Sequence, residues 1–117
     1  MTDDTKELLT YAAKAAGIVF DAELIDIHGI VIEDNTEGAY QSYYWNPATD
    51  DGDSARLRTT LEISVQWTEG IVEVSVDMPL FLGLCEYFAD HSGDKNAALR
   101  WATLRLAAEI GRRMKDD

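Results

Sequence analysis

The sequence predicts a single-domain α+β fold, an α/β/α-type layered sandwich in which three helices cover a mostly antiparallel sheet. Segments with helical spacing of apolar residues alternate with segments rich in β-branched and aromatic residues. The strand-like segments come in pairs joined by polar turns, which is typical of antiparallel hairpins. A chain of 117 residues fits one domain with one core, so residues 1–117 are treated as that domain.

The first element is expected to be a helix over residues 3–16. Leucines and alanines recur at helical spacing through this range, and Glu7 lies in the first turn. Gly17 provides the left-handed residue that commonly ends a helix. Asp3 or Asp4 is expected to cap the helix at its start.

A group of strands is expected next. β-branched residues are concentrated at 24–27 and 30–33, on either side of Gly29, and predict one or two strands. A polar turn is expected at 34–38 and a further strand at 40–45. The strand before the turn and the strand after it should pair as a hairpin.

The segment 45–53 ends this strand and begins a second helix. Pro47 fixes its own φ and disfavours helical geometry at the preceding residue, so the strand should stop there. Thr49 or Asp50 can then accept hydrogen bonds from the free N–H groups of a first helical turn. This helix is expected to run to about Leu61.

The carboxylates of this segment allow two interpretations. Asp50, Asp51 and Asp53 place negative charge where the helix dipole is positive, which stabilises the start of the helix. They could also bind a divalent cation, because hard cations take carboxylate oxygens, but no register matches the calcium-binding loop. We favour helix capping and expect no metal and no other cofactor. A small metal-dependent hydrolase that uses these three residues is the alternative.

The clearest β pattern is a hairpin. Apolar and polar residues alternate through 63–67 and again through 72–76, with a turn at 68–70. One face of this hairpin should be buried and the other exposed to water.

Residues 78–89 are ambiguous. Pro79 could begin a helix, but Gly83 would interrupt it, and an apolar run this short cannot be assigned by periodicity alone. A loop followed by a strand ending near residue 89 is the favoured interpretation, with a turn at 90–93.

The last helix is expected to be capped by Asp94 and to run to about Arg113. Its apolar residues form a wide arc, so the helix should lie flat on the sheet. The arc consists of two stripes: Trp101, Leu104 and Ala108 on one side, and Leu99, Leu106, Ile110 and Met114 on the other.

Charge limits the class of partner. A net charge of −12 disfavours direct binding to nucleic-acid phosphates or to an anionic membrane surface, and favours a protein partner with a basic surface. No apolar run approaches the ~20 residues that span a bilayer, and the acidic start is unlike a secretory signal. A single cysteine, Cys85, cannot form an internal disulfide, which fits a reducing cytoplasm.

No catalytic set is evident, so no catalytic residue is named and no enzymatic activity is expected. The candidate bases are His28 and His91, which belong to different predicted elements. Cys85 and His91 could approach each other across a strand end. A cysteine in an apolar run is more often buried and inert, which is the favoured interpretation.

Aromatic residues at 40–45 mark a candidate binding patch. Tyr43 and Trp45 share one strand face, and Tyr40 and Tyr44 share the other, so an aromatic pair could be exposed beside the acidic residues. Packing in the core is the favoured interpretation of these aromatics. The candidate patch consists of Tyr43, Tyr44, Trp45, Asp50, Asp51 and Asp53.

Two segments taken together resemble a known family. Asn46-Pro47-Ala48-Thr49-Asp50-Asp51-Gly52-Asp53, completed by Arg56-Leu57, and the closing run 104–112 resemble the phage ABA sandwich domain, a family of small phage and prophage proteins of unknown function. The resemblance covers about residues 40–113, with 78–89 departing from the pattern. It implies a bacteriophage or prophage origin and an α/β/α sandwich, and it brings no catalytic residues.

Together these observations predict a non-enzymatic phage accessory protein that acts by protein–protein contact in the cytoplasm of a bacterial host cell, on a host factor with a basic surface. In a sharper version, its carboxylates imitate DNA phosphates and block a nucleic-acid-binding protein. A self-associating structural component is a third interpretation. The sequence leaves the partner and the oligomeric state open.

Overall fold

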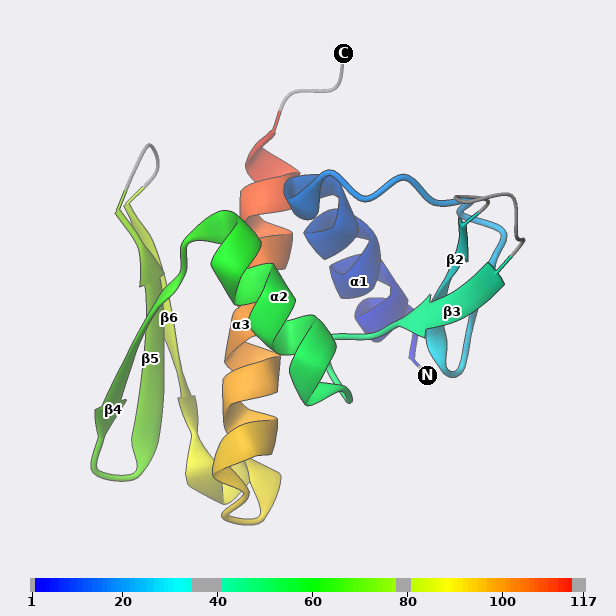
Figure 1. Ribbon diagram of the computed structural model, residues 1–117. Helices are drawn as coiled ribbons and strands as arrows, with labels where there is room; N and C mark the ends of the chain where they lie inside the picture. The colour runs from blue at the N-terminus through cyan, green and yellow to red at the C-terminus, as the bar shows by residue number, and fades with distance from the viewer. Residues whose placement is uncertain (1, 35–40, 78–80, 115–117) are drawn as a thin grey trace.

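In the part of the chain that the structure describes, the strands form two antiparallel sheets, one on each side of the helices (Figure 1). A computed structural model describes residues 2–34, 41–77 and 81–114. In chain order the elements are α1 (Asp3–Ala16), β1 (Ile25–Asp26), β2 (Gly29–Asp34), β3 (Gln41–Trp45), α2 (Asp51–Leu61), β4 (Ser64–Thr68), β5 (Ile71–Val76), β6 (Leu82–Tyr87), the 3-10 turn η2 (Phe88–His91) and α3 (Lys95–Arg113).

The α+β class, with three helices and antiparallel strands in the described ranges, is confirmed. The strands are divided between a first sheet, in the order β1-β2-β3, and a second sheet, in the order β4-β5-β6. The helices lie between these sheets rather than outside a single one, as Figure 1 shows with the second sheet on its left and the first on its right. The sequence did not predict this division.

The division follows from α3, because both of its apolar stripes are buried. One stripe packs against α1 and the first sheet, and the other packs against the second sheet. The prediction that this helix lies flat on a single sheet is therefore wrong, because each stripe has its own partner. Met114 does not belong to the buried part of the second stripe, because it is 42% exposed. The first cluster consists of Leu9, Ala12, Ala13, Ile30, Trp45, Leu57, Leu104 and Ala107. The second cluster consists of Ile63, Val72, Val74, Val76, Ala98, Ala102 and Leu106.

The helices α1 and α3 approach each other closely. Alanines face alanines across this contact, since Ala12, Ala13 and Ala107 are all fully buried. A Cβ added to Gly111 would overlap the backbone carbonyl of Tyr11. Glycine is therefore required at position 111 for the helices to pack at this distance.

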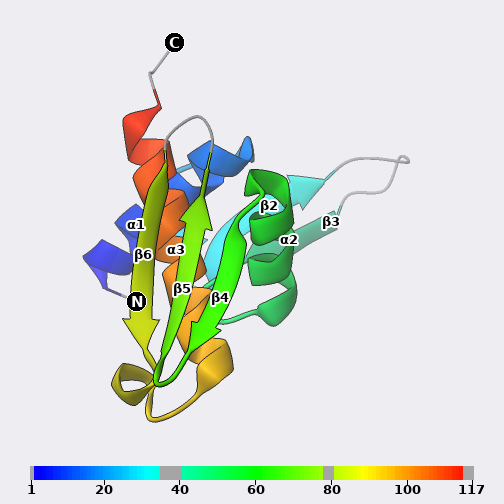
Figure 2. The ribbon, with the colours of Figure 1, turned by 90° about the vertical axis from the view of Figure 1, so that its left-hand side faces the viewer.

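The predicted hairpins are confirmed. β2 pairs with β3 so that Ile30 lies opposite Trp45. β5 pairs with β4 on one side and with β6 on the other. β5 lies over α3 (Figure 2). Its three valines are buried in the second cluster, as the alternating pattern of 72–76 predicts.

Two of the three helix caps agree with the sequence analysis. Asp50 caps α2, and Asp94 caps α3 by accepting the Ala97 N–H at 3.0 Å. The prediction that Asp3 or Asp4 caps α1 is wrong. Thr2 is the cap, because its hydroxyl accepts the Thr5 N–H at 3.1 Å and the two aspartates lie in the first turn.

The remaining boundaries differ in detail. The strand expected at 24–27 is shortened to the two residues of β1. The strand expected within 78–89 is β6, and the turn after it is the 3-10 turn η2. Most of the turn at 34–38, together with Tyr40 and Pro79, lies outside the described residues. None of the described helices is long and apolar enough to cross a membrane.

Candidate functional site

A groove with a volume of about 690 Å³ opens between the end of the first sheet and the start of α2. We call it the aromatic–acidic groove. It is lined by Ala16, Ile18, His28, Tyr43, Tyr44, Trp45, Asn46, Thr49, Asp50, Asp53, Arg56, Leu57 and Thr60. Five of the six residues of the predicted patch are among them, and Asp51 is not. The fold therefore brings the aromatic part of the patch together with two of its three carboxylates.

The carboxylates of Asp50 and Asp53 build the floor of the groove by fixing the first turn of α2. Asp50 Oδ2 accepts the Asp53 N–H at 2.8 Å, as a helix cap does. The Asp53 side chain is only 9% exposed, and its Oδ2 accepts the Asn46 N–H at 2.9 Å. Its Oδ1 accepts a hydrogen bond from Arg56 at 2.7 Å. Asp53 therefore joins the end of β3 to α2.

Asn46 extends this connection to the first sheet. Its side-chain oxygen accepts the Ala48 N–H at 3.0 Å, and its side-chain nitrogen donates to the His28 carbonyl at 3.2 Å. Gly29 allows the close approach, because a Cβ there would lie 2.6 Å from the Trp45 carbonyl oxygen. The wall and floor of the groove are thus held by hydrogen bonds from the side chains of Asn46 and Asp53 to backbone groups.

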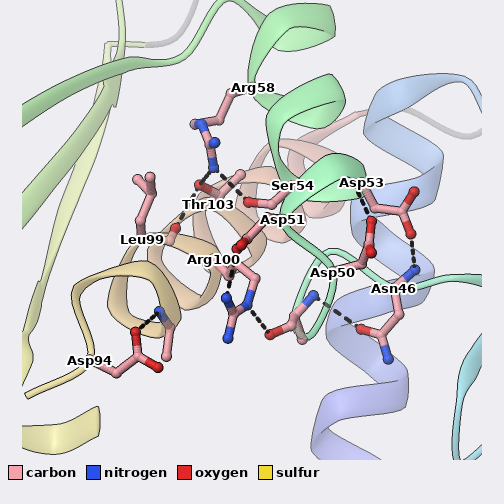
Figure 3. A network of polar contacts seen from close by, with 12 residues as sticks. Asn46, Asp50, Asp51, Asp53, Ser54, Arg58, Asp94, Leu99, Arg100 and Thr103 are labelled. Carbon is pink, nitrogen blue, oxygen red and sulfur yellow. Dashed lines mark hydrogen bonds and ion pairs between the residues drawn. The ribbon is translucent and has the colours of Figure 1, made fainter. Parts of the chain in front are cut away.

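Asp51 is directed away from the groove, which corrects its inclusion in the predicted patch. Its Oδ1 accepts a hydrogen bond at 2.6 Å from Arg100 on α3 (Figure 3). The same guanidinium donates to the Ala48 carbonyl at 3.0 Å. Asp50 is the extended cap residue and Asp51 is the first residue of the helix, so adjacency in sequence does not place the two side chains on one surface. Asp51 serves to fix the start of α2 to α3.

A second polar contact anchors α2 to α3 further along the helix. Arg58 donates to the hydroxyl of Ser54 at 2.6 Å and to that of Thr103 at 3.1 Å (Figure 3). Thr103 in turn donates to the Leu99 carbonyl at 2.7 Å. Partial burial lowers the pKa of Arg58 from its ordinary value. The face of α2 opposite the groove is therefore occupied by structural contacts.

The aromatic residues of the patch divide between core and surface. Trp45 is 6% exposed and belongs to the first cluster, as the packing interpretation predicts. Tyr43 and Tyr44 are 52% and 47% exposed, so the same interpretation is wrong for these two residues. Burial in β3 is confined to its last residue, Trp45, and the four residues before it are exposed. Half-exposed tyrosines at the wall of a groove are available to a ligand.

Tyr44 is held in place by its neighbours. Its hydroxyl donates to Asp26 Oδ2 at 2.8 Å, and its ring centre lies 5.2 Å from that of His28. The pKa of Asp26 is lowered mainly by the hydrogen bond from the His28 N–H and then by that from Tyr44. The pKa of Tyr44 is raised because its proton is shared with this carboxylate. Tyr43 makes no side-chain hydrogen bond to any described residue.

The negative charge of the groove has a sequence signal that spacing arguments missed. Between residues 15 and 55 the chain has nine carboxylates and no lysine or arginine. These nine are Asp21, Glu23, Asp26, Glu33, Asp34, Glu37, Asp50, Asp51 and Asp53. Arg56 and Arg100, both outside this interval, pair with three of them. The Asp50 side chain stays 59% exposed beside the tyrosines.

The carboxylates that the hydrolase alternative requires do not converge. Asp50 faces a backbone N–H, Asp51 faces Arg100, and Asp53 faces Asn46 and Arg56. Within the described ranges, no group of three or more His, Cys, Asp or Glu residues is arranged to hold a metal ion. The cluster is thus a set of separate structural contacts.

The residues considered for thiol chemistry are also separated. Cys85 and Glu86 are consecutive in β6, so their side chains point to opposite faces of the second sheet. His91 contacts Glu86, with 2.9 Å between Nε2 and Oε1, and Arg105 binds the other oxygen of this carboxylate. Glu86, which is only 8% exposed, was not among the residues predicted from the sequence. The sequence feature that could have identified Glu86 is its position as a lone carboxylate on the inward face of β6.

The chain matches no family model, no curated protein and no solved structure. The resemblance to the phage ABA sandwich domain therefore stays a prediction, and the function has to be argued from the groove itself.

Proposed function

We propose that this chain is a non-enzymatic phage or prophage accessory protein that acts inside a bacterial cell by binding a basic segment of a protein partner in the aromatic–acidic groove. The observation that carries the proposal is the exposure of Tyr43 and Tyr44 in a groove of about 690 Å³ beside the carboxylate of Asp50.

The chemistry of this surface suits a cationic side chain. Tyrosines supply contact area at a small entropic cost, and they are enriched among the residues that dominate binding energy. A lysine or arginine over a tyrosine face gains about 0.5–1 kcal/mol at an exposed site. Asp50 adds a charge partner within the same groove.

The rest of the molecule supports this choice of ligand. A net charge of −12 attracts a basic partner over a distance and raises the association rate. Tyr44 is already oriented by Asp26 and His28, so less conformational entropy is lost when a ligand binds. The carboxylates next to the groove have structural partners, which favours binding over metal-dependent hydrolysis.

A titration with a short arginine-containing peptide, followed by amide NMR shifts, tests the proposal. We expect the largest shifts around Tyr43, Tyr44 and Asp50, and weaker binding as salt increases. The variant Asp50→Asn removes one charge but keeps the cap, because asparagine and aspartate cap helices about equally well. Glu73→Gln, on an exposed position of β5, makes the same change of charge away from the groove.

Binding that falls with Asp50→Asn and with Tyr43→Ala, but not with Glu73→Gln, supports the proposal. The same variants, used to capture proteins from bacterial lysate, identify the partner as the protein that the wild type and Glu73→Gln retain and the groove variants lose. Equal loss in Asp50→Asn and Glu73→Gln, with no loss in Tyr43→Ala, would show that net charge alone attracts basic ligands, and would overturn the proposal.

A further inference from the structure

The strand β6 is an open edge of the second sheet, on the side away from α2 (Figure 2). Natural edge strands are usually protected from pairing with another chain by lysine, proline, a bulge or a charge. The six residues of β6, Leu-Gly-Leu-Cys-Glu-Tyr, contain no lysine, arginine or proline. Its one charged side chain, Glu86, points inward and is bound by Arg105 and His91. An inward carboxylate is one of the usual protections, but this one is paired inside the protein, so the outer side of the strand carries none of the other devices in its own sequence.

The backbone groups on this edge can be assigned from the ladder. The Phe88 N–H donates to the Gly70 carbonyl at 3.0 Å, next to the pair of Tyr87 with Ile71. Hydrogen-bonded and non-hydrogen-bonded pairs alternate in an antiparallel ladder. Glu86 therefore bonds to β5, whereas the N–H and C=O groups of Gly83, Cys85 and Tyr87 point outward from the sheet edge.

The outer face of the same strand has two complementary features. Tyr87 is 59% exposed at one end of β6. Near the other end, the sheet surface is hollowed by a volume of about 320 Å³ at Gly83, with Ser75 and Cys85 beside it. The hollow exists because two small residues, Ser75 on β5 and Gly83 on β6, are paired side by side in the sheet.

We propose that β6 pairs antiparallel with β6 of a second copy of this chain, about a two-fold axis at Cys85, to form a continuous six-stranded sheet. In this register Cys85 lies opposite Cys85 of the second copy, and Gly83 lies opposite Tyr87 of the second copy. The outward backbone groups of both strands then bond to each other. Each tyrosine ring covers the glycine hollow of the other copy, an arrangement that stabilises glycine at sheet edges.

Electrostatics predicts an effect of salt that separates this interface from the groove. Two copies with a net charge of −12 repel each other. The repulsion at the seam itself is small, because the two Glu73 side chains stand three strand spacings apart, about 14 Å, which exceeds the Debye length of about 8 Å at physiological salt. Added salt should therefore strengthen the dimer, whereas it weakens binding of a basic peptide in the groove.

Light scattering over a range of protein concentration, at low and high salt, tests the interface. We expect a monomer–dimer equilibrium that shifts toward the dimer with concentration and with salt. Paired residues that exchange hydrogen bonds have Cα atoms about 5.5 Å apart, so a short thiol-to-thiol cross-linker should join two chains through their single cysteines. A Cys85→Ser variant should dimerise and fail to cross-link.

The variant Gly83→Lys fills the hollow and places a charge at the seam. A Cβ at this position meets Ser75 and Val74 only at 3.5 Å, an ordinary contact, so the monomer should fold normally. We expect it to be monomeric, with the thermal midpoint and circular dichroism of the wild-type monomer. Ser64→Lys, on the same face at the opposite edge of the sheet, makes the same change of charge and should still dimerise.

Tyr87→Ala is the second variant and should reduce dimerisation without adding a charge. A wild-type chain that stays monomeric at high concentration and high salt would overturn the inference. A dimer that persists in Gly83→Lys, or that cannot be cross-linked through Cys85, would also overturn it, because the contact would then lie elsewhere. None of these three outcomes bears on peptide binding in the groove.

Discussion

The first and the second sheet have the same number of antiparallel strands, but they are held to the helices in different ways. The strands of the second sheet have five or six residues, and β5 turns three valines toward α3. In the first sheet, β1 has two residues, and the buried contacts come from Ile30 and Trp45. Its position depends in addition on the hydrogen bonds that Asn46 makes to Asp53 and His28.

This difference explains where the groove is. In the second sheet, the valines of β5 fill the space against α3, and the space left open lies at one end of the sheet, beside the half-exposed Trp67. In the first sheet, individual polar contacts set the distance between β3 and α2, and the space between these elements is not filled. A site formed in this way depends on a few anchors, and each anchor can be tested separately.

The largest effect is expected at the contact that holds the first cluster together. Gly111→Ala places a Cβ on the Tyr11 carbonyl, so α1 must move away from α3. Overpacking of this kind typically costs 1–3 kcal/mol, and we expect a decrease of about 3 kcal/mol in the free energy of unfolding. Urea denaturation measures this decrease.

The matched control is Gly83→Ala in the second sheet. Its Cβ meets neighbours only at 3.5 Å, so the free energy of unfolding should change by less than ~0.5 kcal/mol or increase. Equal losses in the two variants would show that the close contact of α1 with α3 is not the weak point of the first cluster.

A smaller loss is expected when the anchor between β3 and α2 is removed. Asp53→Ala leaves the N–H of the buried Asn46 without an acceptor, which costs about 1–3 kcal/mol. Urea denaturation should show a lower midpoint for Asp53→Ala. The fluorescence of the folded variant should also differ from that of the wild type, because Trp45 adjoins Asn46.

Asp51→Ala is the control for this prediction, since it removes a carboxylate from the same turn of α2. The Asp51 side chain is 70% exposed, so its ion pair with Arg100 should contribute less than about 1 kcal/mol. If Asp51→Ala were the more destabilising variant, the connection to α3 rather than Asp53 would be the main anchor of α2.

The smallest effect concerns the pH dependence of the contact between Asp26 and Tyr44, which orients the exposed ring. The lowered pKa of Asp26 means that its contribution to stability is complete above the ordinary value of 3.8 and is lost as pH falls through the lowered pKa. The raised pKa of Tyr44 has the opposite sign, so its contribution is complete below 10.0 and is lost as pH rises through the raised pKa.

Carboxyl NMR titration of the wild type and of Tyr44→Phe measures this contact. We expect the pKa of Asp26 to return part of the way toward 3.8 in Tyr44→Phe, because the His28 N–H still donates to this carboxylate. An unchanged pKa would show that Tyr44 is not bound to Asp26 in solution and that the wall of the groove is not oriented in advance.

Most elements could be predicted from the sequence, because their signals are local. The alternation of β4 and β5, the cap at Asp50, the stop at Pro47 and the two stripes of α3 each depend on residues within a few positions of one another. The cap of α1 was misplaced by one or two positions, since several neighbouring side chains can accept the same N–H groups.

The candidate site could be predicted only in part. The segment that forms its wall and floor was identified, but the favoured interpretation of its aromatics, packing in the core, is correct for Trp45 and wrong for Tyr43 and Tyr44. The separation of Asp51 from Asp50 could not be predicted, because it depends on Arg100, which is 49 positions away along the chain. Burial in β3 is confined to Trp45, so the exposure of the two tyrosines also depends on the tertiary structure.

By itself, the sequence determined the order and type of the elements, the excess of negative charge and the segment that carries the groove, since each of these is a property of nearby residues or of composition. The tertiary structure alone decided that the strands form two sheets, that α3 is buried between them and that β6 is left as an open edge. These features depend on which surfaces meet, and contacts between residues far apart in the chain are set by the packing of the whole core.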